Sequence, residues 1–423
     1  MALIEPKVLL VTTRPWVASA RLALAFRDSG CTVSMICPDG HPIELTSLKA
    51  RTYHYRGLAP LDSTRAAIAY FQPDLVVPCD DLARAHLNSI HLEESRRSSG
   101  TTALLTLIER SLGDPYNYAV QLSRSALIAL AREEGIAAPE TRIISSIAEL
   151  RSWIGQFGLP TVLKTSGTSG GIGVKKARFQ EEAEQFFRAL QSPQRMDQAI
   201  KRALVDRDTS LILPWLQRQT RIVNAQQFLP YTDATIAIAC WQGKVLASIS
   251  TEVLRTTRPN GPSSVVRLVH NADMKQAAAK LAGCLGLSGL YGFDFLVDAA
   301  TGKAWLIEMN PRATQTCYLP LGTGHNLTVA LTATLLGRPI PESNSITDRD
   351  VIALFPHEWL ADSTSKFLNS AYHDVPWSEP KLVEAGVKSR LRNGPWLTYE
   401  NLDRIKSWLR YPRNARRIPG EYL

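Results

Sequence analysis

Two strand-like segments, residues 292–298 and 304–310, carry carboxylates at matched positions. Both segments are apolar, and the turn-forming residues between them predict a β-hairpin. If the hairpin turns near Thr301, Asp294 lies directly across from Glu308. Like charges that face each other across a sheet are unfavourable. The pairing is understandable if a cation lies between the two carboxylates.

The alternation of side chains adds a third group to this pair. Asn310 follows Glu308 by two residues and shares its face, whereas Ile307 and Met309 are expected on the opposite face. Two carboxylates and an amide oxygen are hard oxygen ligands, which suit Mg²⁺ shared with substrate phosphates. The sequence therefore predicts a magnesium site made of Asp294, Glu308 and Asn310. The alternative is a polar-faced hairpin whose acidic side chains contact only water.

A glycine-rich segment, residues 165–174, lies between two apolar strands and directly follows Lys164. Its glycines allow backbone N–H groups to approach a phosphate closely, and its hydroxyl side chains add donors. Lys164 is placed to contact the α- and β-phosphates of a nucleotide, with Ser166, Gly170 and Gly171 in the loop beside it. The segment is not a Walker loop, because no Gly-Lys-Ser/Thr opens a helix. A flexible surface hairpin is the alternative.

The elements that must position these groups begin with residues 7–115, where apolar strands alternate with helices. This alternation predicts an α/β domain with a parallel sheet. Its first turn lacks the Gly-x-Gly-x-x-Gly of dinucleotide-binding folds, so we assign no nucleotide site to it. Asp80 and Asp81 follow the third strand, where capping of the next helix is expected and substrate contact is the alternative. Residues 341–423 are expected to form a separate appendage.

Composition limits the class of protein. The chain has 423 residues, of which 45% are hydrophobic and 21% charged, so it has ample core for several domains. No run approaches the ~20 apolar residues that a membrane span needs, and the N-terminus enters a strand without a leader pattern. The six cysteines form no Cys-x-x-Cys pair, which favours reduced thiols in a cytoplasmic protein.

The formal net charge of +9 suits an anionic ligand but does not identify one. Much of the basic excess follows residue 380. No recognised nucleic-acid-binding motif accompanies it, so nucleic acid is the less favoured partner. A solvated tail or an oligomer contact is the preferred interpretation, and a homodimer is a reasonable expectation.

Taken in order, these pieces resemble the ATP-grasp superfamily, specifically its carboxylate–amine ligase branch, which also resembles the halves of carbamoyl phosphate synthase. The resemblance covers about residues 7–340. It rests on the strand end at 76–81, Lys164 with its glycine loop, the hinge at 227–230 and the segment 294–312. The implied architecture combines α/β and α+β units: a Rossmann-like pre-ATP-grasp α/β domain (1–115), an ATP-grasp domain with two α+β subdomains (116–340), including a small lid at about 140–228, and a C-terminal α/β extension (341–423).

The resemblance implies a role for individual residues. Beside the glycine loop, the implied phosphate contacts are Lys164 and Arg124. The backbone of Gln227 and Leu229, with Phe228 between them, would contact the adenine. Asp233 would contact the ribose or the substrate. The implied ligands of Mg²⁺, or of Mn²⁺ in its place, are Asp294, Glu308 and Asn310. Arg312 would stabilise charge on the transferring phosphoryl group, with Lys164 as the second catalytic cation.

The segment around the ATP-grasp hinge departs from the family pattern at two positions. Gln227 stands where many members have Glu, and Tyr231 where many have Gly, which leaves the ribose contact open. Arg255 and Arg267 flank a Pro- and Gly-rich loop and are, with Arg312, candidate substrate contacts.

The implied activity is that of an ATP-dependent ligase that joins a small-molecule carboxylate to an amine through an acyl phosphate. A carboxylase or carboxy-kinase acting on bicarbonate is the second interpretation, because relatives on the same scaffold carry out that chemistry. A nucleotide-binding scaffold without catalysis is the third. It fits less well, because a scaffold would need only the adenine contacts.

Overall fold

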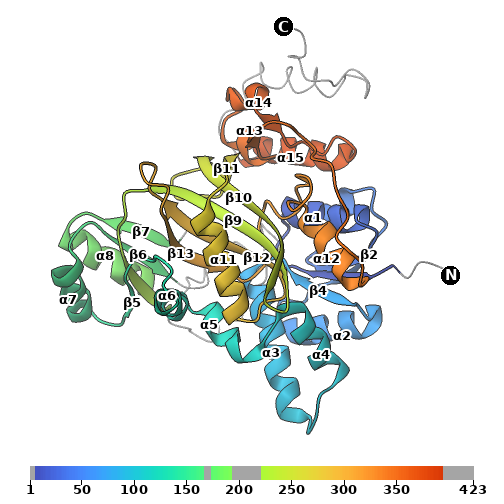
Figure 1. The fold of residues 1–423 in the computed structure, drawn as a ribbon, viewed down its shortest axis with the longest axis horizontal. Coiled ribbons are helices and arrows are strands. Elements are labelled where there is room, and N and C mark those ends of the chain that lie inside the picture. The colour runs from blue at the N-terminus through green and yellow to red at the C-terminus, as the bar shows by residue number, and fades with distance from the viewer. Residues whose placement is uncertain (1–4, 166–172, 193–220, 394–423) are drawn as a thin grey trace.

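The structure is a computed structural model that describes residues 5–165, 173–192 and 221–393. Three sheets organise the described chain: a four-stranded sheet near the N-terminus, a small four-stranded sheet in the middle and a large seven-stranded sheet. In Figure 1 the small sheet and the N-terminal sheet lie on opposite sides of the large sheet. The predicted combination of α/β and α+β units is confirmed.

The N-terminal domain is an α/β unit whose strands are all parallel, as predicted. Its strands lie in the order β3-β2-β1-β4 and are β1 (Lys7–Val11), β2 (Thr32–Cys37), β3 (Arg51–His54) and β4 (Leu75–Pro78). Its helices are α1 (Val17–Asp28), η1 (Pro42–Leu45), α2 (Pro60–Phe71), α3 (Asp81–Arg97) and α4 (Ala103–Leu112). The edge strand β3 was not predicted, because its polar side chains are mostly exposed and give no apolar signal.

A short helical link leads from this domain to the small sheet. The link contains η2 (Pro115–Asn117), α5 (Tyr118–Leu122) and α6 (Arg124–Glu133). The small sheet is antiparallel, in the order β5-β8-β6-β7, with β5 (Thr141–Ile144), β6 (Thr161–Thr165), β7 (Val174–Ala177) and β8 (Val223–Gln227). Helices α7 (Ile147–Phe157) and α8 (Gln180–Gln191) pack their apolar sides on one face, around Trp153 and Phe187. The other face is left for polar side chains.

The large sheet is built from the C-terminal half of the chain, in the order β13-β12-β9-β10-β11-β14-β15. Its strands are β9 (Thr232–Trp241), β10 (Lys244–Thr256), β11 (Ser263–Leu268), β12 (Gly289–Val297), β13 (Ala304–Asn310), β14 (Val351–Ala353) and β15 (Tyr372–His373). Strands β9 and β10 form a hairpin with a glycine turn, where Gly243 has a positive φ of 81°. Helix α11 (Ala272–Cys284) covers one face of the sheet and α12 (Leu327–Leu335) the other.

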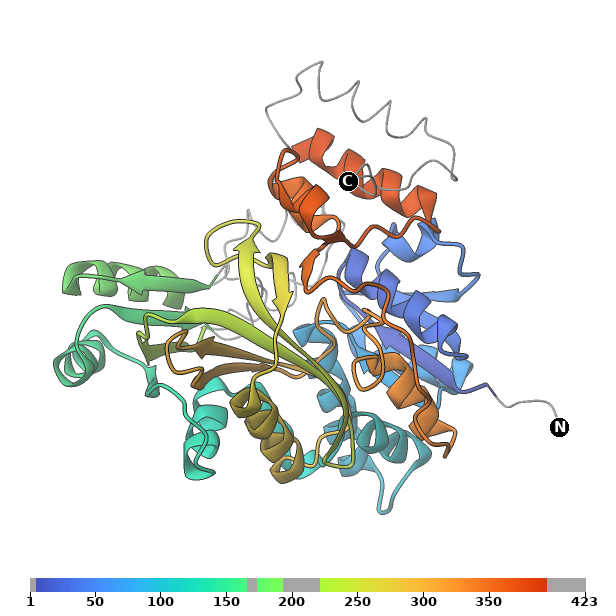
Figure 2. The same cartoon turned by 45° about the horizontal axis from the view of Figure 1, so that its top comes forward.

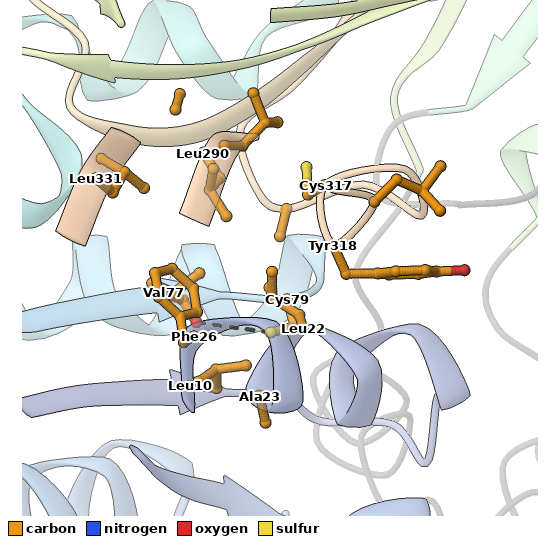
Figure 3. Close-up of a cluster of buried hydrophobic side chains, with 14 of the residues drawn as sticks. Leu10, Leu22, Ala23, Phe26, Val77, Cys79, Leu290, Cys317, Tyr318 and Leu331 are labelled. Atoms are coloured by element: carbon orange, nitrogen blue, oxygen red, sulfur yellow. Dashed lines mark hydrogen bonds between the residues drawn. The ribbon is translucent and has the colours of Figure 1, made fainter. Parts of the chain in front are cut away.

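The N-terminal domain and the large sheet share one hydrophobic core. Figure 3 shows Leu22 and Phe26 of α1 below Leu290 of β12 and Leu331 of α12, with Cys317 near Leu290 and Cys79 near Leu22. At this junction the Ala313 N–H donates to the Pro78 carbonyl at 3.0 Å, which ties the loop after β13 to the end of β4. The end of the acidic hairpin, formed by β12 and β13 with Asp294 and Glu308, is therefore fixed against the N-terminal domain.

The C-terminal extension continues the large sheet, whereas the sequence suggested a separate appendage. Strand β14 hydrogen-bonds to β11, and β15 lies parallel to β14. The extension also contains helices α13 (His357–Ala361), α14 (Phe367–Ser370) and α15 (Pro380–Asn393). In Figure 2 these helices lie above the sheet, close to the N-terminal domain. Asp374 forms an ion pair of 2.5 Å with Arg21, so the extension also contacts the N-terminal domain. The basic segment after residue 393 lies outside the described residues.

Two simpler expectations can be compared with the structure. Among the helices of the described ranges, none is long and apolar enough to cross a membrane. All six cysteines are free thiols, and only Cys284 is exposed. The prediction of unpaired cysteines is confirmed.

Candidate active site

The acidic hairpin has the register that the sequence predicts. Asp294 on β12 pairs directly with Glu308 on β13, and Gly292 pairs with Asn310. The three polar side chains follow the alternation of the two strands and share one face. On its other side Asp294 pairs with Thr235 of β9, so a row of polar side chains runs across the sheet.

A β-bulge interrupts one part of the predicted pattern. The pairing shifts between Asp294 and Phe295, so that Phe295 pairs with Leu306 and Ile307 is the extra residue. Leu306 and Met309 therefore both enter the core below the sheet, whereas Ile307 is only half-buried. Because a bulge interrupts strict alternation, the face on which Ile307 lies stays a prediction.

The electrostatics of the hairpin suit a metal ion. Burial and the nearby charge of Glu308 raise the pKa of Asp294 to about 7, although a hydrogen bond from Asn310 Nδ2 to Asp294 Oδ2 at 3.1 Å opposes this. A carboxylate held in this way gains most from a cation, because the cation removes the repulsion that raises its pKa. The donor set of two carboxylates and one amide oxygen fits Mg²⁺.

Arg124 brings positive charge to the acidic pair. Helix α5 ends at Leu122, and Arg124 is the first residue of α6, directly after the N-cap Ser123. Its Nη2 lies 2.5 Å from Glu308 Oε1, and its side chain is 9% exposed. Among the described residues, Nε and Nη1 of Arg124 have no hydrogen-bond partner. These buried donors are available to an anion that binds beside the carboxylates.

Lys164 lies on the polar face of the small sheet and is 5% exposed. Burial, followed by the charge of Arg124, lowers the pKa of Lys164 to about 8, while Glu308, Asp294 and Asp233 act against this shift. The charge on Lys164 therefore senses both carboxylates of the large sheet. The small sheet and the large sheet bring their charged groups to one place, as a site for a polyanion requires.

Arg312 completes the group of cations at the end of the hairpin. Its Nη2 donates to Asn310 Oδ1 at 3.1 Å, and its Nε donates to Asp81 Oδ1 at 2.9 Å. Asp80 caps α3 as expected by accepting a hydrogen bond from the Ala83 N–H. Asp81 is thus a site residue. From the sequence it received the same interpretation as Asp80, the residue that caps the helix.

The hinge between the two sheets contains a contact that sequence reasoning missed. Strand β8 ends at Gln227, and the ammonium group of Lys176 on β7 lies 3.5 Å from the ring centroid of Phe228. Lys176 shares a face with Lys164, because Val162 pairs with Lys176 and Lys164 pairs with Val174. The alternation of the segment 174–177 could have indicated this second lysine.

The other predicted residues lie in different places. Asp233 is exposed at the start of β9 and pairs with Leu296, near Lys164. Arg255 contacts Glu358 of the C-terminal extension at 2.9 Å, and Arg267 contacts Glu252 at 3.1 Å. No described contact joins these two arginines to the acidic hairpin, and their role toward a substrate stays a prediction. Ser166, Gly170 and Gly171 lie outside the described residues.

We expect the unliganded protein to lose stability as the pH rises, through Asp294. Its pKa is about 7 in the folded state and 3.8 in its ordinary environment. Between these values the folded state binds a proton that the unfolded state has lost, so stability decreases by up to ~1.4 kcal/mol per pH unit. Asp294→Asn should remove this contribution. Denaturant unfolding without metal or nucleotide measures this effect. The free energy of unfolding of the variant, relative to that of wild type, should rise from pH 5 to pH 7.

The matched control is Asp298→Asn in the turn of the same hairpin. A hydrogen bond from the Ala300 N–H lowers the pKa of Asp298, so its contribution is fully present above pH 4 and is lost only as the pH falls further. The stability difference between this variant and wild type should therefore stay constant from pH 5 to 7. An equally constant difference for Asp294→Asn would contradict the raised pKa.

Comparisons with known proteins agree with this geometry. Residues 129–316 match a family model described as an ATP-grasp domain. The carbamoyl phosphate synthase large chain of Pseudothermotoga lettingae is 25% identical over 225 residues, which are 52% of this chain and 19% of that protein. The formate-dependent phosphoribosylglycinamide formyltransferase of Chlorobaculum tepidum is 25% identical over 295 residues, 66% of this chain and 63% of that protein. This chain thus spans about a fifth of the first relative's length.

Solved structures share the fold. Carboxyaminoimidazole ribonucleotide synthase from Aspergillus clavatus, complexed with ATP, has a TM-score of 0.56 at 15% identity, covering 81% of this chain and 79% of that one. The biotin carboxylase domain of Hydrogenobacter thermophilus 2-oxoglutarate carboxylase, in complex with MgADP and bicarbonate, has a TM-score of 0.56 at 16% identity, covering 81% and 72%. At this level of identity the likeness concerns the fold alone.

Proposed function

We propose that the chain, whose residues 129–316 match the model of an ATP-grasp domain, is an ATP-dependent ligase that joins a carboxylate to an amine. One observation carries the proposal: a half-buried pair of carboxylates, Asp294 and Glu308, lies among the cations Arg124, Lys164 and Arg312. A scaffold that only bound adenine would not need this cluster. Phosphoryl transfer needs alignment and positive charge, which the cluster supplies.

The proposed reaction has two steps. A carboxylate oxygen of the acid attacks the γ-phosphorus of ATP, the bond to the β–γ bridging oxygen breaks, and ADP leaves. The amine nitrogen then attacks the acyl carbon, inorganic phosphate leaves, and the nitrogen releases a proton. The amide and one proton are the remaining products.

Each polar side chain of the cluster has a part in this scheme. Arg124 and Lys164 hold the phosphates, with the free guanidinium donors of Arg124 directed to them, and Arg312 stabilises charge on the group in transfer. Asp294, Glu308 and Asn310 would hold Mg²⁺, with Mn²⁺ as a substitute. When bound, the metal neutralises phosphate charge.

The identity of the acid is a separate question from the chemistry. Bicarbonate is the second candidate carboxylate, because one structure of the same fold contains bicarbonate with MgADP. With bicarbonate the first step would give carboxyphosphate and the second a carbamate. Dependence of turnover on added bicarbonate separates this reaction from one that uses an organic acid. A homodimer and a cytoplasmic location stay predictions.

Trapping with hydroxylamine tests the acyl phosphate. ATP, Mg²⁺ and a library of small carboxylic acids are supplied with hydroxylamine in place of the amine, and hydroxamate and phosphate are measured together. We expect hydroxamate in proportion to the phosphate released, because hydroxylamine captures an acyl phosphate as an amine would. Phosphate release with a proven substrate but without hydroxamate would contradict the two-step route.

A further inference from the structure

Arg84 of helix α3 is a fully buried arginine without an acidic partner. It is 0% exposed, and among the described residues no carboxylate lies within ion-pair distance of it. Its Nη1 donates to the Tyr291 hydroxyl at 3.1 Å, and its Nη2 donates to Gln121 Oε1. The guanidinium carbon lies 4.9 Å from the ring centroid of Tyr118 and 5.7 Å from that of Tyr291. Neutral oxygens and aromatic faces thus hold the cation.

Folding stability gives little reason for such a residue. Removing a charge from water is costly, and the cost is recovered only when its partners are complete. Within the described ranges Nε of Arg84 has no hydrogen-bond partner. Apolar residues of similar volume often match or exceed the stability of a buried charge. The feature that an apolar residue could not reproduce is the set of directed hydrogen bonds.

Helix α3, which carries Arg84, also links it to Arg312. Arg84 lies one turn after Asp81 on α3, on the same side of the helix. Asp81 is the residue that accepts the hydrogen bond from Arg312 Nε. A shift or rotation of α3 would therefore move the carboxylate that orients Arg312.

The other connections lead to the acidic pair. Gln121 precedes Arg124 by three residues, and Arg124 is the cation that contacts Glu308. Tyr291 precedes Asp294 by three residues on β12, and its hydroxyl also donates to a backbone carbonyl at 2.7 Å. One guanidinium group thus joins helix α3, which carries the partner of Arg312, helix α5, which ends shortly before Arg124, and strand β12, which carries Asp294.

We propose that Arg84 is a positioning residue, which fixes α3, α5 and β12 relative to one another and so aligns Arg312 and Arg124 with the carboxylates of the acidic hairpin. It does not contact the substrates. The role of the aligned residues in ATP turnover rests on the proposed function, whereas the alignment itself does not.

The test is Arg84→Met, which keeps volume and removes the charge and the hydrogen bonds. We expect kcat for ATP turnover to decrease by about 10- to 100-fold, as for a displacement of about 1 Å at a reacting group. The melting temperature should change by less than about 3 °C, because an apolar side chain replaces a costly charge. In spectra of arginine-labelled protein, the Nε–H signal of Arg312 should shift, because its hydrogen bond to Asp81 changes.

Arg65→Met is the matched control. Arg65 also contacts α3, through ion pairs of 3.1 and 3.2 Å to Glu93 and Glu94, but these lie toward the other end of the helix. It should leave kcat and the Arg312 signal unchanged. Unchanged kcat and an unchanged Arg312 signal in Arg84→Met would overturn the proposal, and so would a loss of activity that only parallels unfolding.

Tyr291→Phe decides the question if Arg84→Met does not fold. It removes one hydroxyl and keeps the ring, and we expect a shifted Arg312 signal and a several-fold lower kcat. An unshifted signal with wild-type kcat would overturn the proposal. If wild type itself turns over no ATP with any acid, the proposed function fails, and the Arg312 signal alone then decides whether Arg84 has a positioning role.

Discussion

Glu308→Gln should lower ATP turnover by about 10²- to 10³-fold while the protein stays folded. The substitution keeps the shape of the side chain and an oxygen that can accept from Arg124, whose Nη2 lies 2.5 Å from Glu308 Oε1. It removes one of the two negative charges that would hold the metal. Loss of one such electrostatic group typically costs about 10²- to 10³-fold in kcat. Phosphate release from ATP measures the loss, and the circular dichroism spectrum checks the fold.

Glu252→Gln is the control for this experiment. Glu252 lies on strand β10 of the same sheet and pairs with Arg267 at 3.1 Å, and no described contact joins it to Asp294 or Glu308. Its turnover should stay within about twofold of wild type, as expected for a surface ion pair of small energetic value. If Glu308→Gln kept wild-type turnover, the metal assignment would be refuted.

Arg312→Lys should give the second large loss. The variant keeps a positive charge but cannot reproduce the fork that reaches Asp81 at 2.9 Å and Asn310 at 3.1 Å. If Arg312 stabilises the group in transfer, kcat should decrease by about 10³-fold. The dissociation constant of MgADP should change much less, because ADP lacks the transferring phosphoryl group. Phosphate release from ATP gives kcat, and titration calorimetry gives the dissociation constant of MgADP.

Arg349→Lys provides the comparison for Arg312→Lys. Arg349 donates to backbone carbonyls of the C-terminal extension, including that of Ala371 at 3.1 Å, and no contact of the described residues joins it to the hairpin. Both kcat and MgADP affinity should remain as in wild type. A loss of MgADP affinity as large as the loss of kcat would instead assign Arg312 to ground-state binding.

The acidic hairpin could be predicted from the sequence because its register depends on residues that lie close together in the chain. Alternating apolar residues and a turn near Thr301 fix the register, and a shift by one residue would move every side chain to the other face. The bulge at Ile307 could not be predicted, because nothing in the alternation marks the extra residue. Lys176 could have been found, since it occupies the same face of its hairpin as Lys164.

The contacts between distant segments could not be predicted. Arg312 and Asp81 are 231 residues apart, Arg124 and Glu308 are 184 apart, and each pair meets only after a helix from the first third of the chain has packed beside the large sheet. Helix periodicity shows which residues share a face, but not which face another domain covers. The same reason explains why β14 was assigned to an appendage, since its place beside β11 depends on pairing with a strand about 85 residues earlier.

A crystal structure of the protein with Mg²⁺ and ADP tests the central claim most directly. We expect a metal ion bound by carboxylate oxygens of Asp294 and Glu308 and by a phosphate oxygen of the nucleotide, with Lys164 and Arg124 at the phosphates. A nucleotide bound elsewhere, or bound here with its metal away from both carboxylates, would contradict the account.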